Sequence, residues 1–181
     1  MRFHETGLQD AWLIEPEPAH DERGFFARTF CIREFAEQGL TTHFVQHSLS
    51  QTKARGAVRG MHFQRPPHAE VKLVSCARGA ILDVIIDLRP NSPSYRQWRG
   101  FELTPDNHRR LYVPEGFAHG FQTLEHDTEV LYQISEFYSP EHARGVRWDD
   151  PAFGISWPDD ERTIADRDRS YPDFRPPRPV R

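Results

Sequence analysis

The chain has 181 residues and a formal net charge of −4 at pH 7, with 28% of its residues charged. This acidic balance argues against general binding to nucleic acid or anionic membranes, although a local basic pocket for one anionic ligand is compatible with it. The length suits a single domain over residues 1–181, and the 13 phenylalanines predict a core rich in aromatic side chains.

Cys31 and Cys76 show no CxxC spacing, so we expect both to be reduced thiols. The N-terminal stretch has too few consecutive apolar residues for a signal peptide, and no stretch approaches the roughly 18 apolar residues of a membrane-spanning helix. We therefore expect a cytoplasmic protein that binds neither nucleic acid nor membrane.

Short apolar and aromatic runs, separated by Gly, Pro, Asn and Asp, predict β-strands along most of the chain. In chain order they cover residues 11–16, 24–30, 44–51, 57–64, 70–77, 80–88, 97–103, 110–114, 119–124, 129–138 and 145–148. One helix is expected over residues 32–38, with Gly39 as its C-terminal stop, and turns are expected at residues 104–106 and 139–141.

The absence of βαβ alternation and of repeats in the sequence favours an all-β fold with a few short helices. We predict a jelly-roll β-sandwich or a related barrel, because doubling or closing the sheet buries its apolar faces and limits exposed edges. The tail over residues 171–181 is rich in proline and arginine, and we expect it to be extended or disordered.

Three residues in strand-like runs suggest a chemistry: His62 in RGMHFQ, Lys72 in VKLV and Tyr132 in VLYQIS. Together they could supply a base, an electrophile and an acid for proton transfer beside a carbonyl group. Each also has a structural interpretation. His62 could be a satisfied core histidine, Lys72 a guard against aggregation on an edge strand, and Tyr132 a core tyrosine.

Residues 114–121, PEGFAHGF, fit the PxGxxH pattern of the second cupin motif, which in many cupins ends in a metal-binding histidine. The first cupin motif usually carries HxH, but His62-Phe63-Gln64 stands in its place here. A metal site would have to combine His62 and His119 with His68 or Glu70. His68 follows two prolines in a predicted loop, so a metal-free site is favoured.

Long, ordered motifs extend this similarity over nearly the whole chain. They are DERGFFARTF (21–30), RGMHFQ (59–64), VKLVSCARGAILDVIIDLR (71–89), LYVPEGFAHGFQTL (111–124), EVLYQISEFYSPE (129–141), RGVRWDDPAFGISWP (144–158) and IADRD (164–168). In these motifs the chain resembles the dTDP-4-dehydrorhamnose 3,5-epimerase family, whose members are metal-free cupins acting on nucleotide-linked 4-keto-6-deoxy sugars. The resemblance implies an isomerase that needs no metal and no cofactor.

The resemblance assigns His62 as the base and Asp168 as the carboxylate that orients its ring, with Asp166 as the alternative carboxylate. Protons at C3 and C5 of a 4-ketohexose are both alpha to one carbonyl, so one electrophile near O4 can serve both positions. Lys72 matches that electrophile. Tyr132 matches the acid on the opposite face, whose proton completes the inversion.

The resemblance also implies a set of substrate-binding residues. Arg23 and Arg59 match the positions that grip the pyrophosphate, although either could instead form a structural ion pair. His119 lies near the sugar or phosphate, with Asp83 as its polar partner. Tyr138 matches the aromatic residue that stacks on the nucleobase, with plain packing as its alternative. Phe26 of a second subunit would assist it in a homodimer with exchanged N-terminal strands.

Two positions depart from the common family pattern near the expected nucleotide pocket. Arg28 stands where many members carry an acidic residue, and His47-Ser48 follow Gln46 where an asparagine is common. A change from acceptor to donor could alter base preference. We expect conversion of dTDP-4-dehydro-6-deoxy-D-glucose to dTDP-4-dehydro-L-rhamnose. The alternatives are a CDP-linked substrate, a 3- or 5-mono-epimerase, a 3,4-ketoisomerase-like cupin, a metal-dependent cupin or a non-catalytic sugar-binding cupin.

Overall fold

The computed structural model describes residues 1–159 and 161–176 and folds them almost entirely into antiparallel strands. The strands are β1 (Arg2–Glu5), β2 (Trp12–Glu15), β3 (Ala19–Asp21), β4 (Gly24–Phe26), β5 (Gln46–Thr52), β6 (Val58–Gln64), β7 (Lys72–Arg78), β8 (Ile81–Asp87), β9 (Trp98–Leu103), β10 (Arg110–Val113), β11 (Phe117–Thr123), β12 (Thr128–Ile134) and β13 (Ala143–Gly145). The helices are α1 (Ile32–Glu37) and α2 (Asp166–Arg169).

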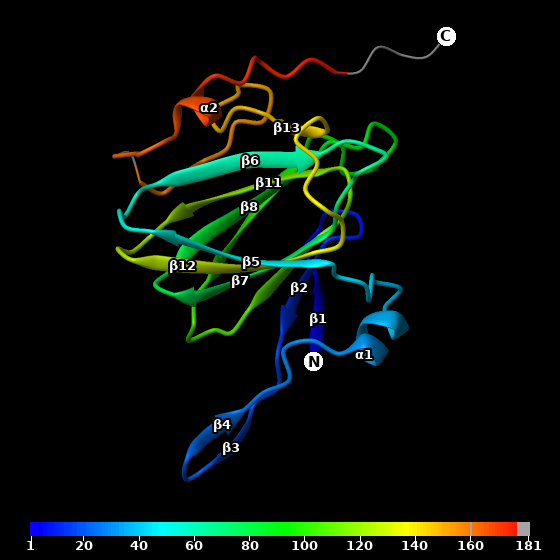
Figure 1. The fold of residues 1–181 in the computed structure, drawn as a ribbon, viewed down its shortest axis with the longest axis vertical. Coiled ribbons are helices and arrows are strands. Elements are labelled where there is room, and N and C mark those ends of the chain that lie inside the picture. Colours follow the sequence, from blue (N-terminus) through cyan, green and yellow to red (C-terminus); the bar gives the residue numbers. More distant parts are fainter. Residues whose placement is uncertain (160, 177–181) are drawn as a thin grey trace.

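The strands form two large sheets. A six-stranded sheet has the order β1-β2-β10-β7-β12-β5, and a five-stranded sheet has the order β13-β6-β11-β8-β9. Neighbouring strands within both sheets are antiparallel. Figure 1 shows the two sheets face to face, with β6, β11 and β8 in one layer and β5, β12 and β7 in the other. This arrangement confirms the predicted all-β jelly-roll architecture.

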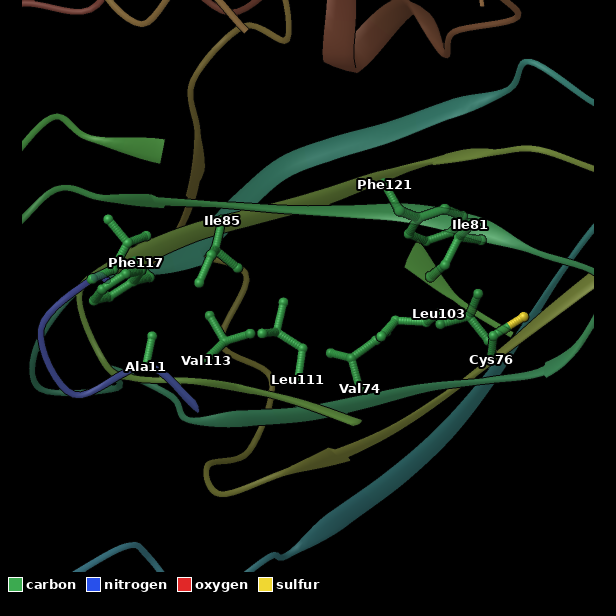
Figure 2. Packing of buried hydrophobic residues seen from close by; sticks show 12 residues of the cluster. Ala11, Val74, Cys76, Ile81, Ile85, Leu103, Leu111, Val113, Phe117 and Phe121 are labelled. Carbon is green, nitrogen blue, oxygen red and sulfur yellow. The ribbon is translucent and has the colours of Figure 1, made fainter. Parts of the chain in front are cut away.

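The main apolar core lies between the two sheets, as Figure 2 shows. On β8, Ile81 and Ile85 belong to this core, whereas Val84 and Ile86 belong to a second cluster on the other face of the same strand. The period of two in a β-strand produces this division, because successive side chains point to opposite faces. Each large apolar side chain fully buried in this way contributes roughly 1.5–3 kcal/mol to stability.

The outer face of the five-stranded sheet is covered by the segment between β13 and α2, residues 146–159 and 161–165, which is called the covering segment. Phe153, Trp157 and Ile164 pack there against Val84 and Ile86 in the second apolar cluster. An isolated parallel bridge joins Ile164 to Val58 at the start of β6. This covering segment continues directly into α2, so its packing places α2 beside β6, as Figure 1 shows.

Helix α1 covers part of the six-stranded sheet through its buried Phe35, which packs with Ile14 and Leu73. The helix ends at Glu37, one residue before the predicted end, and Gly39 follows as the expected C-terminal stop with φ 69°. The N–H of Leu40 donates to the carbonyl of Phe35 at 2.9 Å, and the N–H of Gly39 donates to that of Ala36 at 3.0 Å. This pair of bonds is a Schellman motif, in which glycine adopts the left-handed conformation without a Cβ penalty.

Several predicted boundaries were wrong. The strand expected over residues 145–148 lies at Ala143–Gly145. Val146, which follows it, still exchanges two backbone hydrogen bonds with Met61 of β6, while its side chain packs in the second cluster. The strand expected over 24–30 ends at Phe26, and β1, β3 and α2 were not predicted. β3 and β4 form a hairpin that projects away from the two sheets (Figure 1), leaving Phe26 77% exposed.

The proline-rich tail is described up to residue 176. Within residues 171–176 no helix or strand forms, but Phe174 packs against Phe153 with ring centroids 5.0 Å apart. The backbone N–H of Phe174 donates to Asp150. This part of the tail is therefore seated on the protein, whereas the tail prediction for residues 177–181 lies outside the described residues. In the described parts of the chain, neither helix has the length and apolar character needed to span a membrane.

Candidate active site

A cavity of about 550 Å³ lies between the two sheets. One wall comes from β5, β7 and β12 of the six-stranded sheet and the other from β6 and β11 of the five-stranded sheet, while the segment leading to α2 closes one side. The lining residues are Ser48, Ser50, Thr52, Ala57, Val58, Arg59, His62, Lys72, His119, Phe121, Tyr132, Ile134, Thr163, Ile164, Ala165 and Asp168. The cavity therefore contains all four residues expected to be catalytic.

His62 on β6 and Asp168 on α2 form a hydrogen-bonded pair, with Nε2 and Oδ1 2.7 Å apart. The second carboxylate oxygen of Asp168 accepts the backbone N–H of Gly60 at 3.2 Å. Burial acts to raise the pKa of Asp168, but these hydrogen bonds outweigh burial and hold the pKa below its ordinary value. An ionised Asp168 accepts the Nε2–H of His62, which leaves Nδ1 with the free lone pair of a base.

The alternative carboxylate, Asp166, is exposed, whereas Asp168 is only 4% exposed. An extended segment would have pointed both side chains to one side, but the segment is helical. Residues two positions apart on an α-helix project about 200° apart around its axis. The structure thus places Asp168, and not Asp166, at the imidazole of His62.

Tyr132 reaches the cavity from β12 in the opposite sheet. Its hydroxyl lies 3.4 Å from Oγ of Ser50, and its ring meets that of His119 edge to face with centroids 6.2 Å apart. Burial raises the pKa of Tyr132 well above its ordinary value. The phenol is therefore protonated at neutral pH, as a proton donor must be.

Lys72 lies on β7, in the same sheet as Tyr132, and its ammonium forms an ion pair with the carboxylate of Glu70. Strand β7 is interior to its sheet, between β10 and β12, so the interpretation of Lys72 as an edge-strand guard was wrong. The sequence suggested Glu70 as a possible metal ligand. Its observed place beside Lys72 keeps a buried positive charge compensated at the cavity wall.

His119 and Asp83 form a second, deeper histidine–carboxylate pair. Nε2 of His119 lies 2.7 Å from Oδ1 of Asp83, which is fully buried on β8. Burial raises the pKa of Asp83, while His119 acts in the opposite direction. His119 stands opposite His62 in the register of β11 and β6, so the two histidines share one wall of the cavity.

Arg59 on β6 lies in the cavity wall, and its guanidinium is held by neighbouring polar groups. Nε donates to Oγ1 of Thr52 at 2.9 Å, and Nη2 donates to the carbonyl of Gln51 at 3.1 Å. Both partners are uncharged, so the positive charge of Arg59 remains available to an anion in the cavity.

The other predicted binding residues do not line this cavity. Arg23 lies on the projecting hairpin, where it ion-pairs with Asp21 at 2.5 Å, and Phe26 lies on the same hairpin. Arg28 lies 3.4 Å from Glu34, at the start of α1. Tyr138 is 58% exposed, and its backbone N–H donates to Oε1 of Gln46 at 2.9 Å. The structure leaves these five predicted residues, Arg23, Phe26, Arg28, Gln46 and Tyr138, outside the cavity of their own chain.

Sequence reasoning missed a row of hydroxyl groups on β5. Ser48, Ser50 and Thr52 all line the cavity, opposite the wall that carries His62. They occupy every second position of the strand, so their side chains project to one face. A period of two in small polar residues was the signal that could have revealed this face of the site.

His62 and His119 lie on neighbouring strands, but neither His68 nor Glu70 joins them in a cluster that could hold a metal ion. The ring of His68 is tilted by 50° to that of His142, with centroids 4.5 Å apart, and Nδ1 of His68 lies 3.8 Å from Oε1 of Glu136. Within residues 1–159 and 161–176, no three His, Cys, Asp or Glu side chains converge in a way that would hold a metal ion.

The fold and the site define a cupin-type isomerase, in which His62 and Tyr132 enter one cavity from opposite sheets. Over residues 5–176 the chain matches the family described as dTDP-4-dehydrorhamnose 3,5-epimerase. The chain belongs to this family.

Named relatives agree with this assignment. The dTDP-4-dehydrorhamnose 3,5-epimerase of Methanothermobacter thermautotrophicus is 45% identical, over 97% of this chain and 95% of its own. The Bacillus anthracis dTDP-4-dehydrorhamnose 3,5-epimerase, solved with TDP and PPi bound, is 44% identical with a TM-score of 0.92, covering 96% of this chain and 99% of its own. A Legionella pneumophila dTDP-6-deoxy-D-glucose-3,5-epimerase, solved with dTDP-4-keto-L-rhamnose, is 34% identical with a TM-score of 0.88, covering 94% and 90%.

Proposed function

We propose that this chain converts dTDP-4-dehydro-6-deoxy-D-glucose into dTDP-4-dehydro-L-rhamnose by inverting C3 and C5. The observation that carries this proposal is the placement of His62 and Tyr132 on opposite walls of one cavity. Inversion of a carbon centre requires a proton to leave one face and another to arrive on the opposite face. A base and an acid on facing sheets meet this requirement for a sugar ring that lies between them.

The first step is removal of a proton alpha to the C4 ketone by Nδ1 of His62. Asp168 accepts the Nε2–H of the same ring, so it fixes the tautomer and stabilises the imidazolium that forms. The electrons of the broken C–H bond move into an enolate, whose negative charge gathers on O4. The ammonium of Lys72 stabilises that charge in a cavity of low dielectric constant.

The second step is return of a proton to the carbon from the hydroxyl of Tyr132, on the face opposite His62. The enolate collapses to the ketone and the centre is inverted. Before the second inversion the imidazolium of His62 gives its proton to solvent and the phenolate of Tyr132 regains one, which restores the base and the acid. The same two groups then act at both C5 and C3, because both carbons flank the one carbonyl. Abstraction and return of a proton are redox-neutral, and the chain itself supplies the base, the acid and the enolate stabiliser. The proposed reaction therefore uses no cofactor and no metal.

The nucleotide part of the substrate needs the residues that lie outside the cavity of one chain. We propose a cytoplasmic homodimer in which the β3–β4 hairpin reaches the cavity of the partner subunit. The hairpin would bring Arg23 to the pyrophosphate beside Arg59, and Phe26 to the nucleobase beside Tyr138. The exposure of Phe26 and of Tyr138 supports this proposal, because exposed aromatic side chains are typical of binding surfaces.

The test is to incubate the protein with dTDP-4-dehydro-6-deoxy-D-glucose in deuterated water and follow the C3 and C5 protons by NMR. We expect both signals to disappear as dTDP-4-dehydro-L-rhamnose, the L-lyxo product, forms. His62→Ala abolishes both events, while His43→Ala, an exposed histidine outside the cavity, leaves them unchanged. Exchange at one carbon would identify a mono-epimerase. Lack of exchange would exclude this substrate, and the same assay with the CDP-linked sugar would follow.

A further inference from the structure

Tyr171 lies against the imidazole of His62, although it is not one of the residues that line the cavity. Its ring meets that of His62 edge to face, with centroids 6.2 Å apart and planes at 67°. Tyr171 follows the C-terminal cap of α2, Ser170, and α2 carries Asp168. One short segment therefore brings two groups to the same imidazole: a carboxylate to Nε2 and an aromatic ring to its side.

Three further contacts fix the position of Tyr171. Its hydroxyl accepts the Nε–H of Arg167 at 3.0 Å, and its carbonyl accepts Nη1–H of Arg147 at 3.5 Å. Its ring lies directly over Gly145, where a Cβ atom would come within 2.3 Å of Cζ of the tyrosine. Gly145 on β13 pairs in register with His62 on β6. The aromatic ring is thus seated on the same pair of strands that carries the base.

We propose that Tyr171 is a positioning residue, which holds the imidazole of His62 in the orientation needed for proton abstraction. A single hydrogen bond from Nε2 to Asp168 leaves the ring free to turn about that bond, whereas contact with a second rigid group removes this freedom. Orientation matters because a displacement of the base by about 1 Å can cost roughly 100-fold in rate. The inference rests on the proposed function, in which His62 is the base.

The test compares three variants with the unmodified protein by steady-state kinetics, using substrate deuterated at C3 and C5. We expect Tyr171→Ala to lower kcat about tenfold while KM changes less than about threefold, because the loss falls on the chemical step. The primary deuterium isotope effect on kcat should rise, since proton abstraction becomes more strongly rate-limiting. Tyr171→Phe keeps the ring and should recover at least half of the lost activity.

Phe174→Ala is the matched control, because Phe174 lies three residues further along the same segment and packs on Phe153. It should leave the isotope effect unchanged, even where it lowers the melting temperature. Equal kcat and isotope effect in Tyr171→Ala and the unmodified protein would overturn the inference. An equal rise of the isotope effect in Phe174→Ala, or a loss in Tyr171→Phe as large as in Tyr171→Ala, would overturn it as well.

Two measurements distinguish an error in this inference from misfolding of a variant and from failure of the proposed function. Circular dichroism and thermal melting show whether the Tyr171→Ala chain folds. If it does not, Tyr171→Leu replaces it, because leucine fills much of the same space without an aromatic edge. The same changes in kcat and in the isotope effect are expected of Tyr171→Leu. Deuterium exchange by the unmodified protein, lost in His62→Ala, establishes the proposed function. If that exchange is present and the Tyr171 variants show no effect, the inference about Tyr171 alone is wrong.

Discussion

Asp168 reaches the imidazole of His62 at 2.7 Å although the two residues are 106 positions apart in the chain. The covering segment of the five-stranded sheet makes this contact possible, because the bridge between Val58 and Ile164 aligns it beside β6. The base of the proposed reaction is thus assembled from a strand in the middle of the chain and a short helix near its described C-terminal end.

Replacement of Asp168 tests the importance of this pair. Asp168→Asn keeps the size of the side chain but removes its charge, so the imidazolium loses its stabilising partner. We expect kcat to fall roughly 100- to 10,000-fold, the range that general acid–base groups contribute. Asp166→Asn, two residues away and exposed, should retain full activity. A larger loss in Asp166→Asn than in Asp168→Asn would contradict the assignment of the carboxylate.

Lys72 is expected to stabilise the enolate oxygen. Lys72→Met keeps the length of the side chain and removes the ammonium, and we expect kcat to fall about 100- to 1,000-fold, as when an oxyanion donor is lost. Lys53→Met, at an exposed position, serves as the control. Solvent exchange at C3 and C5 should slow by the same factor as product formation, because both reactions pass through the enolate. Unchanged exchange in Lys72→Met would remove Lys72 from the mechanism.

Tyr132 should separate exchange from inversion. In Tyr132→Phe the base is intact, so protons at C3 and C5 still exchange with solvent, but inverted product should form at least about 100-fold more slowly. Tyr95→Phe, outside the cavity, should change neither rate. Burial raises the pKa of Tyr132 above its ordinary value of 10.0, so inversion should not decline through ionisation of Tyr132 below pH 10.0. Equal loss of exchange and inversion in Tyr132→Phe would contradict its role as the acid.

Asp87 provides a prediction about stability, independent of catalysis. Burial acts to raise its pKa, but hydrogen bonds from Arg89, Ser92 and Ser94 outweigh burial and lower it below 3.8. A lowered carboxyl pKa stabilises the fold above pH 3.8, and this contribution is lost as the pH falls through the folded-state value.

At pH 7 we expect Asp87→Asn to reduce the free energy of unfolding by about 1–3 kcal/mol, because buried charge-assisted hydrogen bonds are lost. The difference from the unmodified protein should shrink in acid, as measured by urea unfolding between pH 7 and pH 3. Asp106→Asn, at an exposed position, should have little effect at either pH. A difference that is the same at every pH would show that the charge of Asp87 does not contribute.

The proposed exchange of hairpins between subunits predicts complementation in mixed dimers. Arg23→Ala and His62→Ala chains should each be inactive alone. In a mixed dimer, the chain that retains His62 receives Arg23 from its partner, so one of its two sites is complete. An equal mixture that is unfolded and refolded together should recover roughly a quarter of full activity, since half of the dimers are mixed. No recovery in a mixture shown to be dimeric would place Arg23 outside the partner's site.

The strands of the core could be predicted from the sequence because each carries its own apolar signal. Ile81 to Leu88 is almost continuously apolar, and the strand is buried on both faces. The helix before Gly39 was equally clear, because the glycine marks its end. β1, β3 and α2 are short and polar, and they depend on contacts with distant segments. Val146 and Trp148 gave a strand-like pattern, but β13 ends at Gly145. Val146 still hydrogen-bonds to the backbone of Met61, and both side chains pack in the second cluster.

The residues of the site also fall into two groups: those that the sequence predicts and those that depend on contacts with distant segments. His62, Lys72 and Tyr132 could be named because each occupies a recognisable motif, whereas their partners follow from tertiary packing. Glu70 is the exception, because it lies two residues before Lys72 and alternate residues of an extended segment project to one face. The hydroxyl of Ser50 beside Tyr132 and the ring of Tyr171 beside His62 connect residues whose relation depends on strand register or on the path of the covering segment. Local sequence patterns carry no information about such contacts.

The separation between His62 and Asp168 also has a consequence for the order in which the protein is made. Translation proceeds from the N-terminus, and all thirteen strands of the described chain precede α2. The ribosome therefore adds every one of these strands, with His62, Lys72 and Tyr132, before it adds the carboxylate that pairs with His62. This pair forms only after α2 has been synthesised and the covering segment has docked beside β6, so a chain that ends before α2 lacks the carboxylate partner of His62.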